Sequence, residues 1–299
     1  MRRYATYCPE WKWDLLHALD RLGVLQHLSF RVHAHIMGRR VRVPLRAGVG
    51  KAFLMVGEPW AHHLFPPLFK AFPGLFLDVG VNLGQTMTLV RLIDPHQPYL
   101  GFEPNPISLG YALQLASLNG FQEVPVMPFG LSDRDADLDL QVDPADPTDP
   151  AATVVADFRP GGRALNRVPV RVLTFSSAEK QRPIGRLGVV KIDVEGSERE
   201  VLRGLDERLG QDRPALVLEV LPTGIPPFGD RLPRQQDIEA QLARLDYRIL
   251  RIDNKPNAIA LERLKGPIGI HADQEMANLI AVPAERAEEI FAALEKAVA

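Results

Sequence analysis

The sequence predicts an α/β fold in which a mostly parallel sheet is covered by helices on both faces. From residue 75 onward, short apolar runs alternate with segments of helical periodicity. The runs are continuously apolar, which is typical of parallel strands that are buried on both faces. The alternation continues to about residue 283, and this order predicts one large sheet rather than separate helical and strand regions.

The first 72 residues are predicted to form an extension with one helix and one hairpin. Leucines recur at helical spacing in residues 12–28, at Leu15, Leu16, Leu19, Leu22 and Leu25. Residues 38–53 alternate apolar and charged side chains and are expected to form a hairpin with Gly48 and Gly50 at its turn. We therefore place the domain boundary between residues 72 and 73, and the apolar stripe of the helix is a candidate homodimer interface.

The elements after residue 73 can be followed in order. The apolar runs that are expected to be strands are "LFLDVG", "YLGFE", "VPVMPFG", "GVVKIDV", "ALVLEV", "YRILRI" and "ANLIAVP". Helices are expected at about 84–93, 106–119, 197–209 and 235–245, with a last helix in "ERAEEIFAALEKAVA". Residues 143–168 interrupt the alternation, since they are rich in Asp, Pro and Gly and show no period, and they are predicted to form a long loop or lid.

Composition and charge restrict the partners and the compartment. The 299 residues carry a formal net charge of −2 with a pI of about 6.5, which argues against a nucleic-acid partner. The single cysteine, Cys8, provides no intrachain disulfide framework, and a cytoplasmic location is expected. No apolar run reaches the roughly 18 residues that a membrane-spanning helix needs.

The stretch "FLDVGVNLGQT" carries the strongest indication of a ligand site. Asp78 ends a strand, and Gly80, Asn82 and Gly84 form the turn into a helix, where glycine allows close backbone approach and Asn tolerates a left-handed conformation. A dinucleotide site has the spacing G-x-G-x-x-G and no acid beside the pyrophosphate. An acid here favours a cationic ligand, and Glu103, at the end of the next strand, is suited to accept ribose hydroxyls. Together they point to S-adenosylmethionine.

Neighbouring residues are expected to complete this cofactor site, because ligands bind at the carboxyl ends of the strands in such sheets. Ser132 and Asp133 follow the third strand, where Asp133 is placed to accept from an adenine amino group, although a turn or helix-cap role is the alternative. The remaining candidates flank the two acids on the first and second strands; they are Gln85, Thr86, Pro104 and Asn105.

These motifs resemble those of the FkbM-type S-adenosylmethionine-dependent methyltransferases. The elements "FLDVGVNLGQT", "GFEPNP", "KIDVEGSEREVLRGL", "PALVLEV" and "NLIAVP" occur in the order of that family and span about residues 75–283. The resemblance implies a seven-stranded class I methyltransferase sheet and methyl transfer to a hydroxyl of a sugar, a glycan or a small metabolite. Val81 departs from the family pattern, which usually has Ala at this position.

Carboxylates at the ends of the fourth and fifth strands are the candidates for chemistry. In "VVKIDVEGSERE", Asp193 and Glu195 are two residues apart, so strand alternation would direct them to the same side, and Glu219 ends the next strand. A carboxylate there is able to accept the proton of an acceptor hydroxyl. Two other interpretations remain open, a magnesium site formed by these three acids and a helix-start role for Glu195. Lys191 is included as a partner of any of them.

Two other classes of function remain as alternatives. A nicotinamide-dependent oxidoreductase uses a similar sheet, but the acid before Gly80 and the missing third glycine argue against it. A non-catalytic binding module is the third interpretation. The presence of both Asp193 and Glu195 argues against it.

Overall fold

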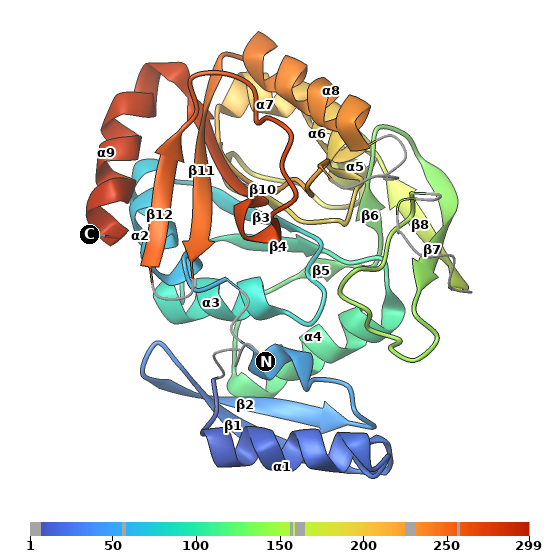
Figure 1. The fold of residues 1–299 in the computed structure, drawn as a ribbon. Coiled ribbons are helices and arrows are strands. Elements are labelled where there is room, and N and C mark those ends of the chain that lie inside the picture. The colour runs from blue at the N-terminus through green and yellow to red at the C-terminus, as the bar shows by residue number, and fades with distance from the viewer. Residues whose placement is uncertain are drawn as a thin grey trace.

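A central eight-stranded sheet organises the computed structural model of the chain, which describes residues 7–55, 58–155, 158, 165–224, 231–255 and 258–298 (Figure 1). The strand order is β12-β11-β13-β10-β9-β3-β4-β5. Neighbours from β10 to β5 are parallel, β13 is antiparallel to β10 and β11, and β12 is antiparallel to β11. The strands are β3 (Leu75–Val79), β4 (Tyr99–Phe102), β5 (Val126–Met127), β9 (Leu187–Ile192), β10 (Ala215–Glu219), β11 (Tyr247–Lys255), β12 (Ala258–Arg263) and β13 (Asn278–Pro283).

The predicted α/β fold with a mostly parallel sheet is confirmed, but its expected count of seven strands is wrong. The additional strand within the described residues is β12, which forms a hairpin with β11 at the edge of the sheet. Its sequence, "AIALER", is short and ends in charged residues, so it lacks the continuous apolar character of the inner strands.

Two hydrophobic cores cover the two faces of this sheet, as side-chain alternation along each strand requires. Phe76 and Val189 belong to one core, and their neighbours Leu77 and Val190 belong to the other. The first core is completed by α2 (Ala61–Ala71), α3 (Gln85–Ile93), α4 (Pro106–Asn119) and α9 (Ala287–Val298), and the second by α5 (Phe175–Gln181), α6 (Glu198–Gly204), α7 (Asp206–Asp212) and α8 (Arg231–Arg244). No helix in the described parts of the chain is long and apolar enough to cross a membrane.

The N-terminal elements differ from their predicted bounds. Helix α1 (Glu10–Arg21) ends before Gly23, which has a positive φ, and a short 3-10 helix (Leu25–His27) follows it. The hairpin consists of β1 (Ser29–Ile36) and β2 (Arg39–Arg46), with its turn at Met37 and Gly38. A tight turn does form at Ala47 and Gly48, where Arg46 and Val49 pair, but it is not the turn of the main hairpin. The first strand of that hairpin was not predicted, because β1 alternates apolar residues with histidines and so lacks a clear hydrophobic pattern.

A second, three-stranded sheet was not predicted. Its strand order is β6-β8-β7, formed by β6 (Gly130–Leu131), β7 (Ala136–Val142) and β8 (Asn166–Leu173). The predicted loop at 143–168 is correct for residues 143–155, which form successive turns, but β8 begins within its last three residues. The rest of that segment, apart from 158 and 165, lies outside the described residues.

The β1–β2 hairpin is attached to α4 along the edge of β2. Asn119, at the end of α4, accepts from the Arg42 amide at 2.8 Å and donates to the Arg42 carbonyl oxygen at 2.9 Å. Tyr111 of α4 donates to the Pro44 carbonyl oxygen at 2.9 Å. These bonds occupy backbone groups of β2 that would otherwise be an open strand edge.

Candidate active site

A cavity of about 520 Å³ lies at the carboxyl ends of the central strands. It brings together most of the site residues expected from the sequence. Those in its wall are Gly80, Asn82, Gln85, Thr86, Glu103, Pro104, Asn105, Lys191, Asp193, Glu195 and Glu219. The structure does not place Asp78, Gly84, Ser132 or Asp133 in this wall.

The turn between β3 and α3 has the left-handed conformations that its sequence predicts. Gly80, Asn82 and Gly84 have φ values of 94°, 47° and 83°. A Cβ atom at Gly80 would lie 1.9 Å from the carbonyl oxygen of Asp193. Glycine is therefore required there because the chain leaving β9 passes against the turn.

The carboxylate of Glu103 is held by two backbone amides. It accepts from the Asn82 amide at 2.7 Å and from the Asn105 amide at 2.8 Å, one on each oxygen. Burial raises the pKa of Glu103 to about 7, although both amides act to lower it. Each oxygen keeps a further lone pair, so this side chain is preorganised to accept donors of a ligand in the cavity.

Two polar atoms in the cavity wall are buried without a hydrogen-bond partner among the described residues. They are the Oδ1 of Asn82 and the Oγ of Ser197. Buried polar groups are rarely left unsatisfied in folded proteins, because the lost solvation costs about 1–3 kcal/mol. A polar ligand group is the natural partner for each.

The other predicted cofactor residues lie behind or beside the cavity. Asp78 is fully buried and accepts a hydrogen bond from the Tyr99 hydroxyl at 2.6 Å, and burial raises its pKa to about 7. Ser132 and Asp133 follow β6 in the small sheet, where their side chains are 3.4 Å apart. The two residues directly before them, Gly130 and Leu131 of β6, do line the cavity.

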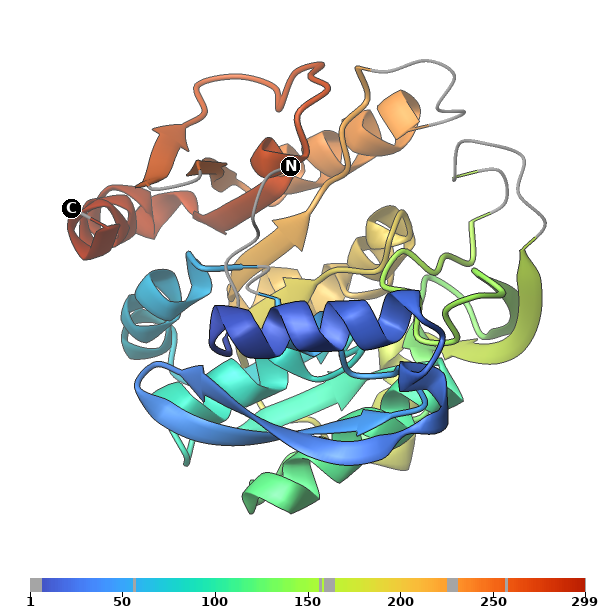
Figure 2. The ribbon, with the colours of Figure 1, turned by 60° about the horizontal axis from the view of Figure 1, so that its bottom comes forward.

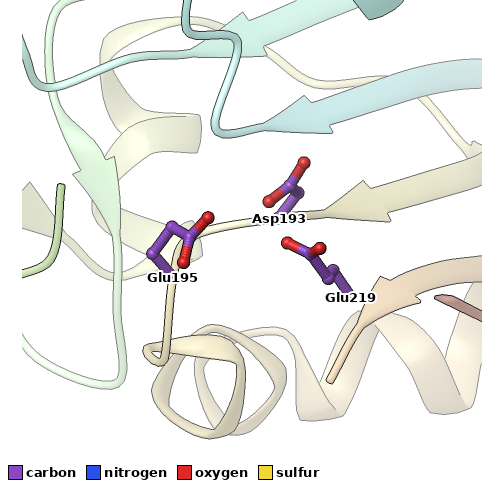
Figure 3. Close-up of side chains that lie close together, drawn as sticks. All are labelled: Asp193, Glu195 and Glu219. Carbon is purple, nitrogen blue, oxygen red and sulfur yellow. The ribbon is translucent and has the colours of Figure 1, made fainter. Parts of the chain in front are cut away.

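Three carboxylates converge at the mouth of β9 and β10, as Figure 3 shows. One oxygen from each of Asp193, Glu195 and Glu219 lies within 4.8 Å of the others. Strand alternation does not bring the first two together, because β9 ends at Ile192. Glu195 instead has a left-handed backbone with φ of 54° and precedes Gly196 with φ of 109°.

A buried lysine controls the charge of this cluster. The Nζ of Lys191 lies 2.7 Å from Asp193 Oδ2 and 3.7 Å from Glu58 Oε1. Burial opposes its charge, but the nearby carboxylates, with Asp193 foremost, raise the pKa of Lys191 above its usual value. Lys191 is therefore a permanent cation that holds Asp193 in place.

Asp193 and Glu219 respond in opposite directions to the same surroundings. Burial acts against ionisation of Asp193, but the Lys191 ammonium holds the pKa of that carboxyl below its ordinary value. Burial and the negative charge of Asp193 raise the pKa of Glu219 well above its usual value. The opposite directions of the two shifts favour a pair in which Asp193 carries the charge, Glu219 carries the proton and a hydrogen bond joins them.

Several residues that line the cavity were not identified from the sequence. Glu58 and Tyr7 come from the N-terminal extension, and Tyr7 Oη lies 3.4 Å from His62 Nε2. Glu58 could have been noticed in the sequence, because no other Asp or Glu occurs between Asp20 and Asp78. Other missed cavity residues have ordinary polar or apolar side chains and belong to no motif; examples are Ala52, Met55, Asn254, Gln274 and Asn278.

Comparison with known proteins identifies related sequences. A family model described as a methyltransferase FkbM domain matches residues 78–249. The chain is 27% identical over 146 residues to Methyltransferase 1 of Beauveria bassiana (strain ARSEF 2860), covering 44% of this chain and 58% of that protein. It is 27% identical over 198 residues to Methyltransferase sdnD of Sordaria araneosa, covering 57% of this chain and 76% of that protein.

Among solved structures, the chain resembles a methyltransferase FkbM from Methylobacillus flagellatus KT. The sequence identity is 15% and the TM-score is 0.42, with 70% of this chain and 43% of that chain covered. The match thus spans just over half of the first curated relative and less than half of this solved chain.

Proposed function

The chain belongs to the FkbM methyltransferase family, and from that premise we propose that it transfers a methyl group from S-adenosylmethionine to a hydroxyl oxygen. The acceptor class is a small molecule, a sugar or a glycan. One observation carries the proposal. The ionised Asp193, fixed by a buried Lys191, lines the same cavity as the preorganised Glu103 carboxylate.

The donor set of the cavity fits S-adenosylmethionine. Glu103 offers two oriented acceptor oxygens, which suit the adjacent hydroxyls of a ribose, and the buried Oδ1 of Asn82 lacks a donor within the described residues. The carboxylates of Glu103, Asp193 and Glu195 favour a cation and disfavour a pyrophosphate. This charge distribution argues against the nicotinamide-dependent alternative.

S-adenosylmethionine supplies a methyl group activated by its sulfonium charge. In the proposed mechanism the acceptor oxygen forms the new bond to carbon as the carbon–sulfur bond breaks, and Asp193 accepts the hydroxyl proton. Lys191 keeps Asp193 ionised and in one position, and the protonated Glu219 donates to it. Alignment of the acceptor by these fixed groups contributes to the rate as well, because it removes the entropy cost of encounter.

A divalent cation is a second candidate for the carboxylate cluster. The three oxygens within 4.8 Å suit magnesium, which would lower the pKa of a bound hydroxyl. The cation would have to displace the proton on Glu219 and compete with the Lys191 ammonium for Asp193. We therefore favour the metal-free arrangement.

Calorimetric titration with S-adenosylmethionine tests the cofactor assignment directly, and absence of binding at millimolar cofactor would contradict it. A screen of hydroxylated acceptors with labelled cofactor, run with and without chelator, then tests the reaction. Turnover that is insensitive to chelator is expected. Binding of reduced nicotinamide in place of S-adenosylmethionine would favour the oxidoreductase.

A further inference from the structure

The N-terminal part of the chain is strongly basic although the whole chain is not. The formal net charge of the chain is −2, yet residues 21–57 contain no Asp or Glu. The seven basic residues in that range are Arg21, Arg31, Arg39, Arg40, Arg42, Arg46 and Lys51. Such charge asymmetry indicates a surface for an anionic partner.

The hairpin gathers most of these charges on its outer face. Its inner face is apolar and buried, formed by Val32, Ala34, Ile36, Val41, Val43 and Leu45. On the outer face the cross-strand pairs are His33 with Arg42 and His35 with Arg40, and Arg31 lies next along β1. None of the hairpin arginines forms an ion pair with a residue that the structure describes, so within this part of the chain their charges are uncompensated.

The outer face also has a concave site. A cavity of about 330 Å³ is lined by His33, Arg40, Arg42, Leu118 and Asn119. The Arg42 guanidinium donates to the Leu118 carbonyl oxygen at 3.2 Å, which holds that side chain at the cavity wall. Clustered cationic donors in a hollow of this kind suit a phosphate group.

Helix α1 adds an exposed apolar stripe beside this basic face. Trp11, Leu15, Ala18 and Leu22 recur at helical spacing and are exposed, whereas Leu16 on the opposite side is buried. Seven of the ten large hydrophobic side chains that are exposed in the described residues lie between positions 11 and 37. Figure 2 shows α1 and the hairpin side by side on the face turned toward the viewer.

The two features adjoin each other. The pKa of His33 is lowered by slight desolvation and then by the positive charges of Arg40 and Lys12, so Lys12 of α1 is close to the basic face. The Lys12 ammonium in turn lies 5.5 Å from the centre of the Trp11 ring. Lys12 thus lies between the basic face of the hairpin and the start of the apolar stripe, and we call the two neighbouring elements together the α1–hairpin face (residues 11–46).

We propose that the α1–hairpin face docks on the surface of an anionic phospholipid bilayer. Aromatic and aliphatic side chains enter the boundary between head groups and acyl chains, while arginines bind lipid phosphates. A second copy of the chain fits less well, because a two-fold interface would place one set of uncompensated arginines against the other. A nucleic acid would leave the leucines of the stripe in water.

Co-sedimentation with vesicles tests this proposal with the full chain. Binding is expected to vesicles that contain phosphatidylserine, to weaken at high salt, and to be at least tenfold weaker for vesicles of phosphatidylcholine alone. The double variant Arg31→Gln/Arg40→Gln is expected to bind about thirtyfold more weakly, because each charge is worth roughly a factor of five. The matched control, Lys180→Gln/Arg182→Gln on exposed positions of α5 and its end, should bind like the unchanged chain.

A second pair of variants tests the apolar stripe. Leu15→Ala/Leu22→Ala is expected to reduce vesicle binding at least tenfold, whereas Ile270→Ala, an equally exposed apolar position elsewhere, should not. The proposal is overturned if anionic vesicles do not bind at low salt, or if the control and test variants lose binding equally. It is also overturned if light scattering shows a dimer that the Leu15 and Leu22 changes dissociate.

Discussion

At the scale of single residues, the proposed chemistry depends on the division of charge between Asp193 and Glu219. The change Asp193→Asn removes the proposed proton acceptor, so turnover should fall by about 10²–10⁴ with cofactor affinity nearly unchanged. Glu219→Gln is the matched control, because it keeps a neutral donor beside Asp193 and should cost less than about tenfold. Turnover of the two variants is measured with labelled cofactor, and thermal unfolding confirms that both are folded. An active Asp193→Asn variant would contradict the assignment of Asp193 as the proton acceptor.

Glu103 predicts how cofactor affinity depends on pH. Its pKa is raised to about 7 by burial, whereas acceptance of two ribose hydroxyls requires the ionised form. The affinity for S-adenosylmethionine should therefore fall as the pH drops below about 7, by at most about tenfold per pH unit. Calorimetry on either side of that value measures the slope. Glu103→Gln should bind more weakly and lose the slope, and an unchanged slope in that variant would assign it to another group.

The sequence predicted which candidate residues line the cavity better than it predicted how these residues meet. Asp193 and Glu219 were found because each ends a buried strand, and strand ends share one edge of the sheet. Glu195 reaches the same place by a left-handed turn that side-chain alternation does not describe. Glu58 was missed because its partner Lys191 is 133 positions away in the sequence, and a contact over that separation cannot be predicted from a local sequence pattern.

At the scale of elements, the β3–α3 turn and the end of β9 form one interlocked unit. Gly80→Ala should lower the free energy of unfolding by at least about 2 kcal/mol, because the new methyl group would clash with the Asp193 carbonyl oxygen at a φ of 94°. Gly110→Ala, inside α4 with open space around it, should instead add about 0.5–1 kcal/mol. Urea unfolding of the two variants checks both signs, and equal effects would contradict this view of the turn.

The helices and strands that the sequence did not predict were missed for related physical reasons. Helix α2 contains Pro66 and Pro67, and proline inside a sequence usually indicates that a helix ends there. The helix forms nevertheless, and its buried face packs against α3 and α9. Strands β7 and β8 pair with each other outside the main sheet and carry charged residues on their exposed face. Both cases show tertiary packing overriding a weak local signal, whereas the inner strands were predicted because burial on both faces makes them continuously apolar.

At the scale of the whole molecule, residues before position 73 and residues after it line the same cavity. Ala52 and Met55 line it and precede Glu58 in the sequence, which makes them candidates for contact with the acceptor. Ala52→Trp should raise the KM for the acceptor at least tenfold by filling this space, and Met55→Ala should admit bulkier acceptors. The cofactor Kd, measured by calorimetry, should stay within about threefold in both variants; a parallel loss of cofactor binding would place these residues on the cofactor side.

Buried carboxyl groups also predict the pH dependence of the stability of the whole chain. Burial raises the pKa values of Asp78, Glu103 and Glu198 to about 7. A carboxyl group with a higher pKa in the folded chain binds its proton more tightly there than in the unfolded chain. Its stabilising contribution is therefore present below about pH 4 and is lost as the pH rises through about 7. Asp193 acts in the opposite sense, because its pKa is lower in the folded chain than in the unfolded chain. Its stabilising contribution is present at pH values above the pKa of the unfolded chain and is lost in acid.

The melting temperature should consequently fall between about pH 5 and pH 8. Glu198→Gln isolates one contribution, because the amide oxygen can still accept from the Gly196 and Val194 amides but no longer titrates. Its pKa difference, from 4.5 to about 7, corresponds to at most about 3 kcal/mol, so the variant should show a visibly shallower pH profile. Calorimetric melting across this range measures it. A profile as steep as that of the unchanged chain would show that Glu198 is ionised in the folded protein, and that the two amides outweigh its burial.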